Sequence, residues 1–214
     1  MTRLWAMVPM SSVEVGTSQG RASDAALLEV AWSSIHHGLR HGVPLEVRPW
    51  QFEASLQELR ASFVTLRIGA QLRGCTGTLE ASRPLVVDVA HNAFGSAFRD
   101  SRFAPLTNEE FPDLDLHISV LDSPERLAVA SEEELLRALR PGKDGLVLEE
   151  GVQRATFLPA VWEQLPAPRE FLRHLKEKAG FPSDYWSPTL RLFRYTVREI
   201  EGGGVRAVRA TALS

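Results

Sequence analysis

The most regular alternation in this chain is the run Leu114-Asp115-Leu116-His117-Ile118-Ser119-Val120-Leu121. Apolar side chains stand at every second position, and polar side chains stand between them. Successive side chains of a strand point to opposite faces, so the run predicts a strand with one buried face and one polar face. We expect Leu116, Ile118 and Val120 to face the core, and His117 with its polar neighbours to face away from it.

Around this strand, the sequence alternates between short strands and helices. Two strand hairpins are predicted, at 63–80 and 146–157, and a last strand is predicted at 190–199. Helical spacing and cap residues, including Ser23 as an N-cap, predict helices at 24–42, 84–99, 131–141, 159–165 and 169–179. Strands joined by tight turns, with helices between the groups, predict an α+β fold with an antiparallel β-sheet flanked by helices.

The size and composition are those of a globular protein with its own core. The chain has 214 residues and is 44% hydrophobic, and its formal net charge of −3 argues against a general nucleic-acid ligand. A single cysteine excludes an internal disulfide and fits a reducing, cytoplasmic location. No apolar run approaches the ~18 residues of a membrane-spanning helix, so no membrane association is expected. We expect residues 1–21 to form a flexible leader and residues 201–214 to form a disordered tail.

The cysteine lies in the run Leu72-Arg73-Gly74-Cys75-Thr76-Gly77. Glycines allow other atoms to approach the backbone closely, and a nearby cation favours the thiolate, which is the reactive form of cysteine. If strand alternation holds, Arg73 and Cys75 share one face, whereas a β-bulge at Gly74 turns Arg73 away. Cys75 is therefore the candidate catalytic residue. The alternative is that it packs as a small hydrophobic side chain.

A second group of candidate residues is the run Arg99-Asp100-Ser101-Arg102-Phe103. Two arginines at a helix end offer paired donors to a carboxylate or phosphate, and Asp100 can orient one of them. In the alternative interpretation, Arg99 interacts with the helix end, and Asp100 and Arg102 form a surface ion pair. Arg154, before the proline-started helix at 159, is a further anion-binding candidate. The predicted ligand-binding residues are Arg73, Gly74, Gly77, Glu80, Arg99, Asp100, Arg102 and Arg154.

The histidines do not complete a metal or catalytic motif. His91 could serve as the base for Cys75, whereas His117 is interpreted as a surface or cleft histidine. No closed set of His, Cys, Asp and Glu ligands is apparent, so no metal is expected. P-loop, G-x-G-x-x-G and CxxC-pair motifs are absent from the sequence, which therefore indicates no cofactor.

Three segments resemble the motifs of the AMMECR domain family: LRGCTGTLE at 72–80, AFRDSRFAPL at 97–106 and DGLVLEEGVQRATFLPAVWEQLP at 144–166. The resemblance extends from about residue 25 to about residue 200. It implies one domain over residues 22–200, with a central antiparallel sheet, flanking helices and a smaller second lobe. It implies no agreed reaction, and it implies Memo-like and radical-SAM-like proteins as partners; the oligomeric state is left open.

Two classes of function remain open. The first is a small-molecule-binding or enzymatic domain, with an anionic-ligand cleft between the 73–80 hairpin and the 99–103 loop and with thiol chemistry at Cys75. The second is a non-catalytic module that binds a protein or RNA partner. A reactive thiol favours the first class, and an inert, buried thiol favours the second.

Overall fold

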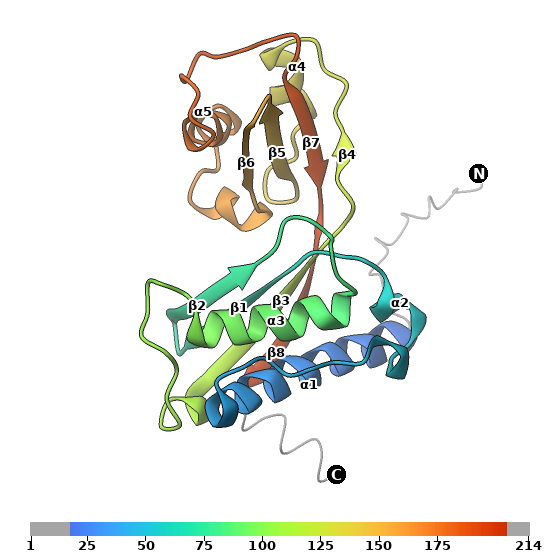
Figure 1. Cartoon of the computed structure of the whole chain (residues 1–214). Helices are drawn as coiled ribbons and strands as arrows, with labels where there is room; N and C mark the ends of the chain where they lie inside the picture. Colours follow the sequence, from blue (N-terminus) through green and yellow to red (C-terminus); the bar gives the residue numbers. More distant parts are fainter. Residues whose placement is uncertain (1–17, 205–214) are drawn as a thin grey trace, which may run out of the picture.

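The computed structural model describes residues 18–204, which form two lobes (Figure 1). The large lobe has a sheet of strand order β2-β1-β3-β8, with bounds Ser62–Ile68 (β1), Gln71–Gly77 (β2), Leu114–Leu121 (β3) and Val197–Gly204 (β8). The small lobe has the order β4-β7-β5-β6, with bounds Glu125–Arg126 (β4), Gly145–Glu150 (β5), Gln153–Phe157 (β6) and Arg191–Tyr195 (β7). All strand pairs are antiparallel, which confirms the predicted α+β class.

Two long helices cover one face of the large sheet (Figure 1): α1, Ser18–His41, and α3, Leu85–Phe98. The core between them contains Leu116, Ile118 and Val120, which are at most 2% exposed, as the alternation in β3 predicted. Burying this apolar face is the main stabilising contribution to the lobe. Three short helical segments complete it: η1 (Pro49–Gln51), α2 (Ala54–Gln57) and η2 (Phe111–Asp113).

The small lobe has a core of its own, formed by its sheet, α4 (Glu132–Ala138), η3 (Pro159–Glu163) and α5 (Pro168–Lys178). Trp162 stacks on Phe171 with ring centroids 3.8 Å apart, and its indole N–H donates to the Asp144 carbonyl at 2.7 Å. Ser131 caps α4 by accepting from the Glu134 N–H, as a capping box predicts.

The chain crosses between the lobes after β3 and again between β7 and β8 (Figure 1). The prediction of one strand at 190–199 is wrong, because the segment belongs to two sheets and breaks at Thr196. At the break, the Asp122 N–H donates to the Thr196 carbonyl at 3.0 Å, which ties the two crossings together. A small apolar cluster around Leu121, Val147 and Tyr195 packs at the same junction.

Both predicted end segments are shorter than expected where the structure describes them. Helix α1 begins at Ser18, so residues 18–21 are helical and Ser23 lies inside the helix rather than at its cap. Strand β8 continues to Gly204, so residues 201–204 pair in the sheet rather than belonging to a tail. A Cβ at Gly202 would lie 2.6 Å from Leu28 and 2.9 Å from the Leu116 carbonyl, so glycine permits this close packing. The remaining end predictions, at 1–17 and 205–214, lie outside the described residues.

Candidate functional site

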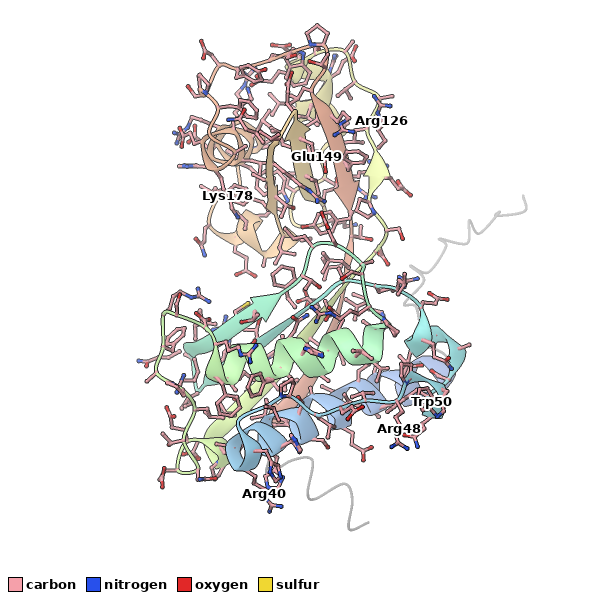
Figure 2. The ribbon with its side chains drawn as sticks, viewed as in Figure 1. Arg40, Arg48, Trp50, Arg126, Glu149 and Lys178 are labelled. Carbon is pink, nitrogen blue, oxygen red and sulfur yellow. The ribbon has the colours of Figure 1, made fainter. Side chains whose placement is uncertain are left out.

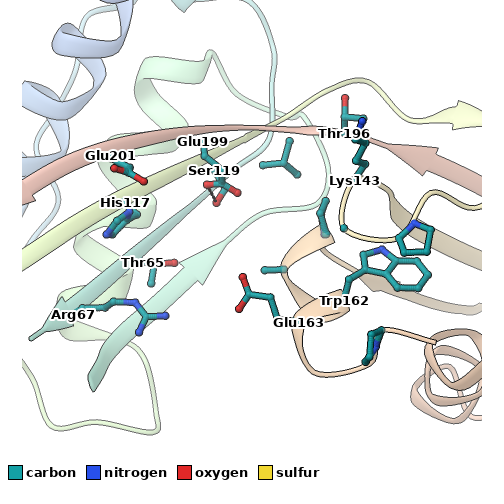
Figure 3. Close-up of a pocket in the computed structure, with 16 residues that line it drawn as sticks. Thr65, Arg67, His117, Ser119, Lys143, Trp162, Glu163, Thr196, Glu199 and Glu201 are labelled. Carbon is teal, nitrogen blue, oxygen red and sulfur yellow. Dashed lines mark hydrogen bonds between the residues drawn. The ribbon is translucent and has the colours of Figure 1, made fainter. Parts of the chain in front are cut away.

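The polar face of the large sheet forms one wall of a cleft between the lobes (Figure 3). The cleft has a volume of about 930 Å³. The sheet contributes polar side chains, and the small lobe contributes the 141–143 loop and η3 on the opposite side. The polar and charged side chains labelled in Figure 3 are Thr65, Arg67, His117, Ser119, Lys143, Glu163, Thr196, Glu199 and Glu201.

Cys75 lies on the same sheet face as this cleft, at the edge strand β2. It pairs in register with Thr65, which in turn pairs with His117. Directly opposed residues of antiparallel strands share a face, and the Thr65 hydroxyl contacts the Cys75 sulfur at 3.4 Å. The thiol is free and half-buried, and it adjoins the cleft through Thr65.

Arg73 does not follow the alternation that would place it beside the thiol. Leu66 pairs with Gly74 and Arg67 pairs with Leu72, so Arg73 is the extra residue of a β-bulge. Its guanidinium binds Glu110 through Nε at 2.8 Å and Nη2 at 2.9 Å. These hydrogen bonds raise the pKa of Arg73 and lower the pKa of Glu110. Of the two alternatives that the sequence left open, the β-bulge that turns Arg73 away from Cys75 is therefore the one observed.

Asp100 and Arg102 bind the backbone of Cys75 at the edge of the sheet. The Cys75 N–H donates to Asp100 Oδ2 at 2.9 Å, and Arg102 Nη2 donates to the Cys75 carbonyl at 3.4 Å. Arg102 also donates to Asp100 through Nε at 2.9 Å and Nη2 at 2.7 Å. These bonds, with the hydrogen bond from Arg102 first among them, hold the pKa of Asp100 well below its usual range. The pair thus supplies partners to an edge strand that would otherwise expose its backbone groups.

The two motif glycines allow close packing within the protein. A Cβ at Gly74 would lie 2.0 Å from the Ser96 carbonyl oxygen, which brings α3 directly against β2. At that contact, the Ser96 hydroxyl accepts from the Thr76 N–H at 2.8 Å and donates to the Val64 carbonyl at 2.7 Å. A Cβ at Gly77 would lie 2.2 Å from the Phe63 ring. The tight β2–α3 contact therefore requires Gly74.

The other predicted ligand-binding residues lie away from the thiol. The Arg99 guanidinium lies 5.0 Å from the Phe94 ring centroid, a contact along its own helix. Arg154 pairs with Glu80 across the two lobes and with Glu149 at 2.9 Å in its own lobe. These residues position elements of the fold, and neither Arg99 nor Arg154 lines the 930 Å³ cleft.

The hairpin and the loop, which the first of the two functional interpretations places together, are in contact at Cys75, Asp100 and Arg102. Arg73 lies nearby, since its guanidinium and that of Arg102 are 5.8 and 5.5 Å from the Phe103 ring centroid. Sequence reasoning missed the cleft residues of β1 and β8 and those of the small lobe. The only signal in the sequence for the cleft was the set of polar positions in β3, because they indicate a sheet face that is not covered by the core. Their partners depend on strand order, which alternation does not encode.

Residues 18–204 contain no evident metal-ligand cluster of three or more side chains and no helix suited to spanning a membrane. No group of three His, Cys, Asp or Glu side chains is placed to hold a metal ion in this part of the chain. None of the helices described there is both long enough and apolar enough to cross a bilayer.

The fold and site define a two-lobed α+β protein whose edge-strand cysteine adjoins an inter-lobe cleft. The AMMECR1 family model matches residues 28–200, and the chain belongs to that family. A protein of Methanothermobacter thermautotrophicus is 34% identical over 181 residues, covering 82% of this chain and 92% of the relative. Protein MJ0810 of Methanocaldococcus jannaschii is 34% identical over 152 residues, 67% of this chain and 74% of the relative. The crystal structure of uncharacterized protein PH0010 from Pyrococcus horikoshii is similar, with TM-score 0.71 and 32% identity over 81% of this chain and 88% of that chain.

Proposed function

We propose that the protein binds a small molecule in the inter-lobe cleft and that Cys75 supplies a nucleophilic thiol to it. One observation carries the proposal: the Cys75 side chain contacts Thr65, a cleft-lining residue on the same sheet face. The cleft has the size of a small-molecule site, about 930 Å³ against roughly 300–1,000 Å³ for ligand pockets generally. A position at the end of such a cleft suits a nucleophile that meets a bound electrophile.

The ligand that we propose carries an anionic group. Arg73, Arg102 and Arg154 are each paired with a carboxylate of the protein, so they are poorly placed to bind it. Arg67 and Lys143 line the cleft, and no ion pair within residues 18–204 involves either. They are the cations that we assign to the anionic group. The cleft also contains carboxylates, among them Glu163 and Glu199, and these could pair with a cationic group on the same ligand.

The proposed chemistry is acyl transfer to the thiol. The sulfur forms a bond to the acyl carbon of the ligand, and the bond from that carbon to its leaving group breaks. The thiol proton leaves with that group, so atoms and charge balance. Nucleophilic catalysis of this kind divides one difficult step into two easier ones.

Alkylation of the native protein tests the proposal. Cys75 is the chain's single cysteine, so iodoacetamide labelling reports on one site. We expect the folded protein to react at pH 7 faster than a free cysteine peptide, and we expect ligands found by thermal shift to slow the reaction. A Cys75→Ser variant measures background labelling. A native thiol that reacts only after denaturant is added would overturn the proposal.

A second candidate function is a module that binds a macromolecular partner. Trp50 is 72% exposed and lies near Arg48 on the large lobe (Figure 2), and Trp and Arg are enriched at protein interfaces. An inert Cys75 together with loss of partner capture in Trp50→Ala would favour this function. A cytoplasmic location, which the single cysteine favours, is a further proposal that fractionation would test. Association with Memo-like and radical-SAM-like proteins, which the family resemblance implies, is another, and co-purification would test it.

A further inference from the structure

Two histidines lie one turn apart at the C-terminal end of α1. His37 and His41 are four positions apart, so their side chains lie on one face of the helix, and their ring centroids are 4.4 Å apart. All six histidines of the chain fall within the described residues, and these two are the ones whose rings contact each other. His37 is half-buried and His41 is exposed, so solvent reaches the pair.

The two rings have no other polar partner in the described part of the chain. No hydrogen bond or ion pair there involves His37 or His41, whereas both ring nitrogens of His174 contact neighbouring side chains. His36, the next residue in sequence, packs on the Phe111 ring with centroids 5.8 Å apart. The nitrogen lone pairs of His37 and His41 are therefore available to a ligand from outside the protein.

The helical turn that carries the pair is fixed against the rest of the large lobe. Gly38 lies so close to α3 that a Cβ there would be 2.4 Å from the Phe98 ring. The helix then ends in a regular cap, because the Gly42 N–H donates to the Gly38 carbonyl at 2.8 Å and Gly42 has a φ of 71°. A backbone held in this way keeps the two imidazoles at their spacing, so little conformational entropy is lost when both bind one ion.

We propose that His37 and His41 chelate a divalent late transition-metal ion, with Cu²⁺ bound more tightly than Ni²⁺ or Zn²⁺. Two imidazoles four positions apart on one helix face are a recurring means of holding such an ion. The carbonyl groups of the last turn give this end of α1 a partial negative charge, which favours a cation, whereas Arg40 on the same turn opposes it (Figure 2). The order of affinities is the one that nitrogen ligands generally show for divalent metals.

The proposed site has two protein ligands and leaves the other coordination positions open. No third His, Cys, Asp or Glu among residues 18–204 is placed to join the pair. Water therefore completes the coordination, which suits the tetragonal geometry of Cu²⁺ better than the closed tetrahedral geometry of structural zinc. An ion held by only two side chains exchanges readily, so folding does not require it and purification need not retain it.

Calorimetric titration of the full-length, untagged protein with NiCl₂ tests the proposal, at about pH 8 because coordination requires neutral imidazole. We expect one ion per chain. His37→Gln or His41→Gln should weaken binding roughly 100-fold, because the second imidazole of a chelating pair binds the ion intramolecularly. The double variant should bind little more weakly than either single variant. His36→Gln is the matched control, since it removes a neighbouring histidine that packs on Phe111, and it should leave the Kd unchanged.

Electron paramagnetic resonance with Cu²⁺ identifies the ligands directly. A Cys75→Ser background removes the thiol, which would otherwise compete for copper, and the spectrum should show coupling to two imidazole nitrogens, reduced to one by His41→Gln. Melting curves establish that each variant is folded.

Three results would overturn the inference: no Ni²⁺ binding by the native protein, a Kd unchanged in His37→Gln/His41→Gln, or equal weakening by His36→Gln. None of them bears on the alkylation of Cys75, because α1 covers the core face of the sheet and the thiol lies on the cleft face. The proposed function and the metal site therefore fail separately.

Discussion

Replacing Asp100 with alanine removes the hydrogen bond between this carboxylate and the edge strand, together with the bonds that it makes to Arg102 in its own loop. Asp100 accepts from the Cys75 N–H at 2.9 Å, from the Arg102 N–H at 3.1 Å and twice from the Arg102 guanidinium. Hydrogen bonds to charged groups contribute about 1.5–3 kcal/mol each when buried, whereas an exposed ion pair contributes about 0–1 kcal/mol. The Arg102 side chain is 55% exposed, so its ion pair with Asp100 should contribute little to stability. Asp100 is only 6% exposed, so most of its contribution should come from the hydrogen bond with the Cys75 N–H.

We expect Asp100→Ala to lower the free energy of unfolding by about 2–3 kcal/mol and Asp100→Asn, which keeps an acceptor for Cys75, by about 1 kcal/mol. For a chain of this size, the first change corresponds to a fall in Tm of roughly 4–12 °C. Urea denaturation measures the difference, and Glu29→Ala on the exposed face of α1 is the control, expected within about 0.5 kcal/mol of the native protein.

The contribution of Asp100 to the free energy of unfolding should depend on pH in a predictable direction. The pKa of Asp100 is lower in the folded state, so its contribution is complete above the ordinary aspartate value and is lost as pH falls through the folded value. The stability gap between native protein and Asp100→Ala should therefore stay constant from about pH 5 to about pH 8 and shrink below about pH 4. Equal urea midpoints at pH 7, or a gap that persists unchanged into strong acid, would refute this account of the loop.

Four further predictions concern separate parts of the molecule. Gly74→Ala should destabilise the fold by about 3 kcal/mol or more, because its Cβ would meet the Ser96 carbonyl at 2.0 Å; Gly69→Ala, at a positive φ of 57° with open space around it, should cost only about 1 kcal/mol. Burial raises the pKa of Tyr195 to about 12, so ultraviolet titration should show a tyrosine that stays protonated at about pH 11 in the folded protein and ionises normally in urea. Glu80→Gln should change the unfolding free energy by less than about 1 kcal/mol, because Glu80 is 75% exposed in its pair with Arg154; a larger loss would mean that the pair is essential for lobe docking. Dialysis against a chelator should leave the melting curve unchanged, and stoichiometric zinc or iron retained through purification would contradict this.

Local patterns predicted the individual elements well because each pattern reports a property of its own segment. The alternation in β3 gave the strand and its buried face, and the capping box at Ser131 gave the start of α4. The same alternation misled at 190–199, where it continues through Thr196 although the chain changes sheets there. Alternation shows which face is buried but does not show against which sheet, because pairing partners are distant in sequence.

The candidate site was predictable only in part for the same reason. The contact between the hairpin and the 99–103 loop belonged to one of the two interpretations that the sequence left open, and the direction of Arg73 depends on a bulge that is established only by the register with β1. The cleft is still less local, since His117, Glu201 and Lys143 come from three separated segments. These three residues are far apart in the sequence, so no short sequence motif could predict that they share a cleft.

The contacts around Cys75 show which residues of the 72–80 and 97–106 motifs stabilise the fold and which side chain is left accessible from the cleft face. Gly74 is required by the contact with α3, Arg73 is bound by Glu110, and Asp100 and Arg102 bind the Cys75 backbone. Every one of these interactions is internal to the protein and fixes β2 at the edge of the sheet. The Cys75 side chain differs, because its sulfur is free and points to the cleft face beside Thr65. A rigid backbone that holds this thiol beside the cleft would suit the nucleophile that we propose, since positioning lowers the entropic cost of meeting a bound electrophile.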